Sequence, residues 1–210
     1  MTAYIYLHGF ASSPRSSKAT YLCDRFAEMN LKLKVLDLNQ GDFGSLTLTR
    51  QIAQTVAAFP DEATPVTLIG SSFGGLTSAW VAQQQLQVQN LVLLAPAFGF
   101  PQNWYSQLPP DRIEQWRKSG FLSIYHYGEN KTIPLHYGFL QDADNYPVTG
   151  LRRSLPTLII HGIRDEVVPI QVSRDYAQQH SQVELIELDS DHGLNDVRSK
   201  IWQETKNFLF

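Results

Sequence analysis

One stretch of the chain reads Val66-Thr67-Leu68-Ile69-Gly70-Ser71-Ser72-Phe73-Gly74-Gly75-Leu76. Its first four residues form a short apolar and β-branched run, which is typical of a strand buried on both faces. After the glycines, Leu76, Ala79 and Trp80 recur at helical spacing. The stretch therefore predicts a strand, a sharp turn and a helix, with Ser72 at the apex of the turn.

Ser72 is the predicted nucleophile. A serine at such an apex occupies strained backbone dihedrals, and the positions two before and two after it must be small because strand and helix pass close together. Gly70 and Gly74 bracket Ser72 in this way, whereas no such pair brackets Ser71, the other candidate. The five-residue pattern also occurs by chance, and the alternative is a glycine and serine turn without chemistry. The strand before it and the helix after it favour the nucleophile.

The composition limits the kind of protein. The chain of 210 residues suffices for one domain, residues 1–210, with a well-buried core. Its formal net charge of -3 gives no electrostatic footprint for nucleic acid or an anionic membrane, so we expect neither partner. Cys23 is the only cysteine, which argues against a disulfide framework and a cysteine-based metal site. Without a basic leader or a bilayer-spanning apolar run, the sequence predicts a cytoplasmic protein.

Predicted strands and helices alternate along the chain. We expect strands at residues 3–7, 31–38, 66–69, 90–96, 156–162 and 183–188, and helices around residues 19–26, 52–59, 76–80, 170–180 and 197–208. This order is that of an α/β fold with a doubly wound, mostly parallel sheet of about six strands and helices on both faces. The lysines of segment 31–38 place that strand toward an edge of the sheet.

A serine hydroxyl needs a base that takes its proton, and the base needs a third group that fixes its tautomer. Functional residues of open α/β sheets gather at the carboxyl ends of the strands. Of the six histidines, only His192 lies in a short polar loop beyond the last predicted strand, so we predict it as the base. His8 and His161 end strands but precede glycine, which suits a tight turn.

Asp165 is the predicted acid, because its loop leaves the fifth strand at the same edge of the sheet. Asp189 and Asp191 are alternatives because they are close to His192 in the sequence. Adjacent side chains in a loop usually point apart, however, and the acid must approach the imidazole nitrogen that faces away from the serine.

The negative charge that develops on a substrate oxygen calls for two backbone N–H donors. The N–H of Phe73 lies at the start of the predicted helix, where free donors and the helix dipole coincide. The second donor should come from the loop after the first strand, and we assign it to the N–H of Phe10. In that loop we expect His8 to brace the backbone rather than to react.

Residues 98–155 interrupt the alternation of strands and helices and are rich in aromatic side chains. An insertion at this point lies over the carboxyl edge of the sheet, where its rings pack against the body or around a substrate. We expect a helical lid with a helix at residues 111–118. The predicted substrate contacts are Phe98, Phe100, Trp104 and Tyr105, which favour an apolar acyl or aryl group.

These features together resemble an α/β-hydrolase: the turn at residues 70–74, the segment His8-Gly9-Phe10, the loop ending at Asp165, and then His192, in the order serine, acid, histidine. More narrowly, residues 6–19 (Tyr-Leu-His-Gly-Phe-Ala-Ser-Ser-Pro-Arg-Ser-Ser-Lys-Ala) and 70–75 are similar to the small YqiA-like esterases. That resemblance implies hydrolysis of a small-molecule carboxylic ester or acyl thioester through an acyl-enzyme, without metal or cofactor.

Two other functions stay open at this point. The same scaffold supports other reactions, such as those of peptidases and lyases, because fold and function are separable. A noncatalytic binding protein on a hydrolase frame is the third possibility, and the presence of Ser72, Asp165 and His192 together argues against it.

Overall fold

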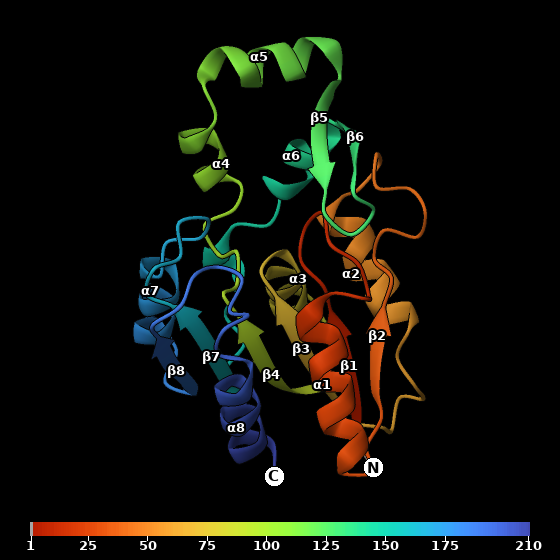
Figure 1. Cartoon of the computed structure of the whole chain (residues 1–210), viewed down its shortest axis with the longest axis vertical. Coiled ribbons are helices and arrows are strands. Elements are labelled where there is room, and N and C mark those ends of the chain that lie inside the picture. The colour runs from red at the N-terminus through yellow and green to blue at the C-terminus, as the bar shows by residue number, and fades with distance from the viewer. Residues whose placement is uncertain (1) are drawn as a thin grey trace.

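The computed structural model describes residues 2–210, and its centre is a six-stranded sheet with strand order β2-β1-β3-β4-β7-β8 (Figure 1). All pairings within this sheet are parallel. The strands are β1 Ala3–Leu7, β2 Leu33–Leu36, β3 Val66–Ser71, β4 Val88–Leu94, β7 Thr157–Gly162 and β8 Val183–Leu188. The predicted fold class is thereby confirmed, and every strand of the sheet delivers its following loop to the same edge.

Helices cover both faces of the sheet. Those that belong to the sheet are α1 Ser17–Glu28, α2 Leu48–Ala57, α3 Phe73–Gln84, α7 Gln171–Gln179 and α8 Arg198–Leu209. Because side chains alternate along a strand, Tyr6 packs with α1 and α8 on one face, while its neighbours Ile5 and Leu7 pack with α2 and α3 on the other. The sheet is thus covered by one apolar layer on each face.

The helix that follows the predicted turn is the most deeply placed of these. In α3 the positions from Phe73 to Ala82 are all buried, so this helix is apolar all round rather than amphipathic. Its strand, β3, is buried at every position as well. The turn that carries Ser72 is therefore held between two elements that cannot shift without disturbing the core.

The strand β2 lies at an edge of the sheet, as its lysines predict. Lys34 is exposed and donates from Nζ to the carbonyl oxygen of Ala58 at 2.7 Å. A charged, short edge strand of this kind disfavours pairing with another chain.

The insertion between β4 and β7 lies beyond the edge toward which the parallel strands point (Figure 1). It contains α4 Gln102–Gln107, α5 Pro110–Ser119, the strands β5 Phe121–His126 and β6 Lys131–His136, α6 Gly138–Ala143 and the 3-10 turn η1 Val148–Gly150. The expected helix at residues 111–118 is present as α5, and its buried Trp116 donates from Nε1 to the carbonyl oxygen of Leu135 at 2.9 Å.

The insertion contains the expected helices and, in addition, an antiparallel hairpin of β5 and β6 that the sequence did not predict. Exposed and less exposed positions alternate along β5, the period of a strand with one solvated face. Two of the exposed positions are aromatic, so the sequence of β5 does not alternate between apolar and polar residues. Within residues 2–210, none of the helices combines the length and the apolar character needed to cross a membrane.

Candidate active site

Ser72 forms the sharp turn between β3 and α3. Its φ of 54° and ψ of -116° lie outside the ordinary regions, and its N–H donates to the carbonyl oxygen of Leu94 at 2.8 Å. A Cβ at Gly70 would overlap the carbonyl oxygen of Gly74, and a Cβ at Gly74 would overlap the carbonyl oxygens of Leu7 and His8. The two glycines are thus required by close backbone approach, which is the reason the sequence pattern has them.

Three side chains from separate loops meet at this turn. Nε2 of His192 lies 3.0 Å from Oγ of Ser72, and Nδ1 of His192 lies 2.7 Å from Oδ2 of Asp165. A carboxylate can only accept here, so Nδ1 carries the proton and the lone pair of Nε2 faces the serine hydroxyl. The imidazole is therefore held in the tautomer that can take a proton from Ser72.

Asp165 is a carboxylate held by four donors. Oδ1 accepts from the N–H groups of Val167 at 2.9 Å and Val168 at 2.7 Å, and Oδ2 accepts from His192 and from Nε2 of His161 at 3.1 Å. Burial alone would raise the pKa of Asp165, but the hydrogen bonds from His161, His192 and Val168 hold this pKa well below its usual range. The acid therefore stays ionised beside the imidazole.

His161 is a part of the site that the sequence reading assigned only to a tight turn. Its fully buried ring lies between the Oγ of Ser173, 2.7 Å from Nδ1, and two acceptors of Nε2, Asp165 and the carbonyl oxygen of Val168. Both acceptors require a proton on Nε2, so Nδ1 accepts from the Ser173 hydroxyl. The only sequence signal was its spacing of four residues from Asp165 across the end of β7.

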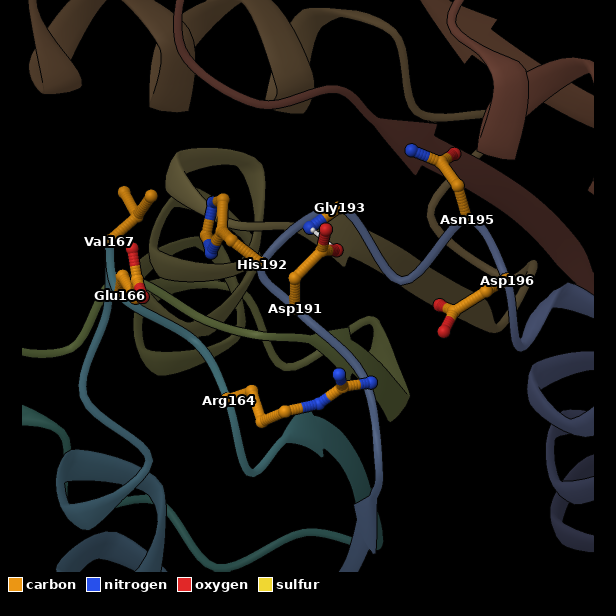
Figure 2. Close-up of a pocket in the computed structure, with 8 residues that line it drawn as sticks. All are labelled: Arg164, Glu166, Val167, Asp191, His192, Gly193, Asn195 and Asp196. Atoms are coloured by element: carbon orange, nitrogen blue, oxygen red, sulfur yellow. Dashed lines mark hydrogen bonds between the residues drawn. The ribbon is translucent and has the colours of Figure 1, made fainter.

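The two alternative acids lie elsewhere. Figure 2 shows the carboxylate of Asp191 turned toward the backbone N–H of Gly193, 2.8 Å away, and not toward the imidazole. Asp189 forms an ion pair with Arg164 at 2.8 Å on the surface. The structure therefore brings Asp165, and neither alternative, to the imidazole of His192.

The loop after β1 runs directly past Ser72. A Cβ added at Gly9 would lie 3.4 Å from the Cβ of Ser72. Among residues 2–210, no protein group accepts a hydrogen bond from the backbone N–H of Phe10 or of Phe73. Both N–H groups are therefore free to bind an oxygen near Ser72, although their roles as donors to a substrate stay a prediction.

His8 braces this loop, as we expected. Nδ1 lies 2.9 Å from the carbonyl oxygen of Gly9, and Nε2 accepts from the N–H of Leu38 at 3.2 Å. Burial lowers the pKa of His8, which favours the neutral ring that these two bonds require.

An apolar cavity of about 310 Å³ opens beside Ser72 and is lined on the insertion side by Phe100, Asn103, Trp104, Tyr127 and Phe139. Two of the four predicted substrate contacts, Phe100 and Trp104, thus face the cavity. Phe139 and Tyr127 also line the cavity; they belong to the aromatic residues of the insertion, but they were not among the four predicted contacts.

Phe98 and Tyr105, the other two predicted substrate contacts, do not line this cavity. The ring of Phe98 is buried against Tyr176, with 4.3 Å between ring centroids. The hydroxyl of Tyr105 donates to Oδ2 of Asp144 at 3.0 Å. Their positions differ from the prediction: Phe98 precedes α4 and packs against α7, and Tyr105 follows Trp104 on α4 and therefore points in another direction.

Residues 2–210 contain no cluster of three or more His, Cys, Asp or Glu side chains that could hold a metal ion. The side chains gathered at Ser72 instead suit proton transfer and attack by a hydroxyl.

The sheet order and the strand-turn-helix at Ser72 define an α/β-hydrolase fold, and solved structures of that fold match nearly the whole chain. Alpha/beta hydrolase domain-containing protein 10 from mouse is 20% identical over 99% of this chain and 89% of its own, with a TM-score of 0.83. Est1E from Butyrivibrio proteoclasticus with bound ferulic acid is 20% identical over 100% of this chain and 90% of its own, with a TM-score of 0.81. No curated protein matches the sequence. The chain belongs to the uncharacterised protein family UPF0227, whose model matches residues 3–209.

Proposed function

We propose that the protein is a serine hydrolase that cleaves carboxylic esters or acyl thioesters through an acyl-enzyme intermediate. The observation that carries this proposal is the continuous hydrogen-bonded chain from Ser72 through His192 to Asp165, with distances of 3.0 and 2.7 Å. These distances are those required for a nucleophile, a base and an orienting acid.

The geometry supports a two-step reaction. His192 takes the proton of Ser72 as Oγ attacks the substrate carbonyl, and the free N–H groups of Phe10 and Phe73 receive the oxygen that becomes negative. His192 then gives the proton to the departing alcohol or thiol. In the second step, water attacks the acyl-enzyme with His192 as base and releases the acid.

Asp165 contributes by charge as well as by orientation. Its low pKa keeps the carboxylate ionised, so it stabilises the imidazolium that forms when His192 accepts the proton. A noncatalytic binding protein would have no need for this arrangement.

The apolar cavity indicates the acyl part of the substrate. Its aromatic lining and its volume of about 310 Å³ suit an acyl chain or an aryl group, and its opening onto Ser72 places such a group next to the nucleophile. The bound ferulic acid of Est1E, which has the same fold, is an aryl acid of this kind.

Trp104→Ala tests this assignment of the cavity. We expect kcat/KM for p-nitrophenyl hexanoate to fall about tenfold, since burial of a large apolar side chain is worth roughly 1.5 to 3 kcal/mol, while the acetate ester changes less than threefold. Tyr105→Ala removes a neighbouring ring outside the cavity and is the matched control. Equal losses on both esters, or equal effects of the two variants, would refute the assignment.

His161→Phe tests the support of Asp165. The variant leaves the buried Ser173 hydroxyl without its acceptor and removes one of the two donors to Oδ2 of Asp165, which costs about 1 to 3 kcal/mol of unfolding free energy. We expect kcat to fall about tenfold as well, because Asp165 loses one of the donors that fix it. Urea unfolding and ester hydrolysis measure the two effects, with His180→Phe as a histidine control outside the site. A stability loss with unchanged kcat would restrict His161 to folding.

A further inference from the structure

A second cavity, of about 430 Å³, reaches Ser72 and His192 and has a polar lining that the proposed reaction does not use. We call it the polar cavity, and its polar side chains other than Ser72 and His192 include Tyr6, Ser12, Ser16, Ser17, Lys18 and Ser71. Most of these residues belong to segment 6–19, the stretch that resembles the YqiA-like esterases. Neither the apolar core nor the predicted triad requires so many hydroxyl groups there.

The hydroxyl of Tyr6 is the clearest sign that this cavity binds something. The side chain is fully buried and lines the cavity, and within residues 2–210 its hydroxyl has no hydrogen-bond partner. The hydroxyls of Ser71 and Ser16 are close enough to act against the rise in the pKa of Tyr6 that burial causes. A buried hydroxyl without a partner costs free energy, and a ligand in the cavity would remove that cost.

The start of α1 supplies further donors to the same cavity. Ser16 caps the helix by accepting from the N–H of Ala19 at 3.4 Å, whereas the N–H groups of Ser17 and Lys18 have no acceptor among residues 2–210. A helix N-terminus with free N–H groups favours negative charge. Nζ of Lys18 donates one of its protons to the carbonyl oxygen of Gly193 at 2.6 Å, so it has two others.

The polar cavity and a second, open groove both reach His192, and their linings carry different charges. Among residues 2–210, the lining of the polar cavity contains the ammonium group of Lys18 and no carboxylate. The open groove whose lining Figure 2 draws meets the polar cavity at His192, Gly193 and Asn195, and it is lined by Arg164 and by the carboxylates of Glu166, Asp191 and Asp196. The lining of the polar cavity therefore favours an anion more than the lining of the groove does.

We propose that the polar cavity binds the leaving-group half of the substrate, an alcohol or thiol that carries a phosphate or carboxylate within a few bonds of the scissile ester. The inference rests on the proposed hydrolase function and deepens it. The apolar cavity already accounts for the acyl half. His192 must protonate the leaving group, and the residues that follow it, Gly193 and Asn195, line the polar cavity.

Lys18 also has a positioning role that the test must separate from ligand binding. Its bond to Gly193 holds the loop of His192, so removing it disturbs hydrolysis of every ester. Burial lowers the pKa of Lys18 to about 8, and the nearby carboxylates of Asp191 and Asp165 oppose that shift, so the ammonium is mostly charged at neutral pH. A ratio of kcat/KM values between two esters cancels the general disturbance and keeps the charge-specific effect.

The experiment compares four hexanoate esters at pH 7, with leaving groups ethanol, choline, 3-hydroxypropanoate and 2-hydroxyethyl phosphate. We expect wild-type kcat/KM for at least one anionic ester to exceed that for the choline ester tenfold or more, and the better anionic ester identifies phosphate or carboxylate. Lys18→Met should lower the ratio of anionic to ethyl ester at least tenfold and Tyr6→Phe about fivefold, as expected for hydrogen bonds to a charged group. Tyr4→Phe, on the same strand but packed against Phe26, is the control and should leave the ratio unchanged.

Tyr6→Phe should also keep the midpoint of urea unfolding or raise it, because the hydroxyl that it removes has no partner in the free protein. This inference would be overturned if the ratio of anionic to ethyl ester were the same in wild type and both variants, or if the wild type preferred the choline ester. Hydrolysis of ethyl hexanoate would still support the proposed function in that case. The inference would also be contradicted if monoethyl adipate, whose carboxylate is on the acyl half, were hydrolysed faster than ethyl hexanoate while the esters of anionic alcohols were not. The anion site would then belong to the acyl half of the substrate. No hydrolysis of any ester by the wild type would overturn the proposed function itself.

Discussion

Ser72→Ala is expected to lower kcat for ester hydrolysis on the order of 10⁴- to 10⁶-fold, the loss that follows when the nucleophile of such a triad is removed. The reason is structural as well as chemical. Within residues 2–210, Oγ of Ser72 is the one hydroxyl that Nε2 of His192 contacts, at 3.0 Å, and the strained turn holds it there. Assays with p-nitrophenyl hexanoate under substrate saturation measure the effect.

The fold should survive this substitution. The side chain of Ser72 bonds only to His192 among residues 2–210, so we expect the free energy of unfolding to change by less than about 1 kcal/mol. Ser181→Ala replaces an exposed serine outside the site and is the matched control for both activity and stability. Turnover within tenfold of wild type in Ser72→Ala would exclude Ser72 as the nucleophile, and loss of activity in Ser71→Ala alone would transfer the role to its neighbour.

Asp165→Asn has the second largest expected effect, a decrease in kcat of about 10³- to 10⁴-fold. An amide that offers N–H₂ to Nδ1 of His192 would favour the other tautomer and put a proton on Nε2, which then cannot accept the proton of Ser72. The variant also removes the charge that stabilises the imidazolium. Because Asp165 accepts from two imidazoles and two backbone N–H groups, some loss of stability accompanies the loss of rate.

Asp191→Asn is the matched control for this experiment. Asp191 is the alternative acid by sequence position, but its Oδ1 accepts from the N–H groups of Gly193 and Leu194, and an asparagine oxygen can do the same. We expect kcat to change less than tenfold. A larger effect of Asp191→Asn than of Asp165→Asn would assign the orienting acid to Asp191.

The sequence predicted the central part of the fold because that part is fixed by local requirements. Buried parallel strands need apolar runs, and the turn at Ser72 needs glycines where backbones nearly touch, so both leave a clear pattern. The meeting of Ser72, Asp165 and His192 followed from one topological rule, that parallel strands bring their carboxyl ends to the same edge.

The insertion was harder to predict because some of its aromatic side chains are buried and others are exposed. Phe121 and Tyr125 are exposed along β5, so hydrophobicity did not report the hairpin. Whether a ring faces the cavity depends on how its segment packs on the body: Phe98 packs on Tyr176 of α7, a contact between residues far apart in the sequence. His161 was missed because its partners, Ser173 and Val168, come together only in three dimensions.

The most direct test of the account is labelling with a fluorophosphonate, followed by peptide mapping with tandem mass spectrometry. We expect one adduct per chain, on Oγ of Ser72, with loss of ester hydrolysis in proportion to labelling and no adduct in His192→Ala under the same conditions. A stoichiometric adduct on another residue, or an active protein that the reagent does not label, would contradict the claim that His192 and Asp165 make this hydroxyl reactive.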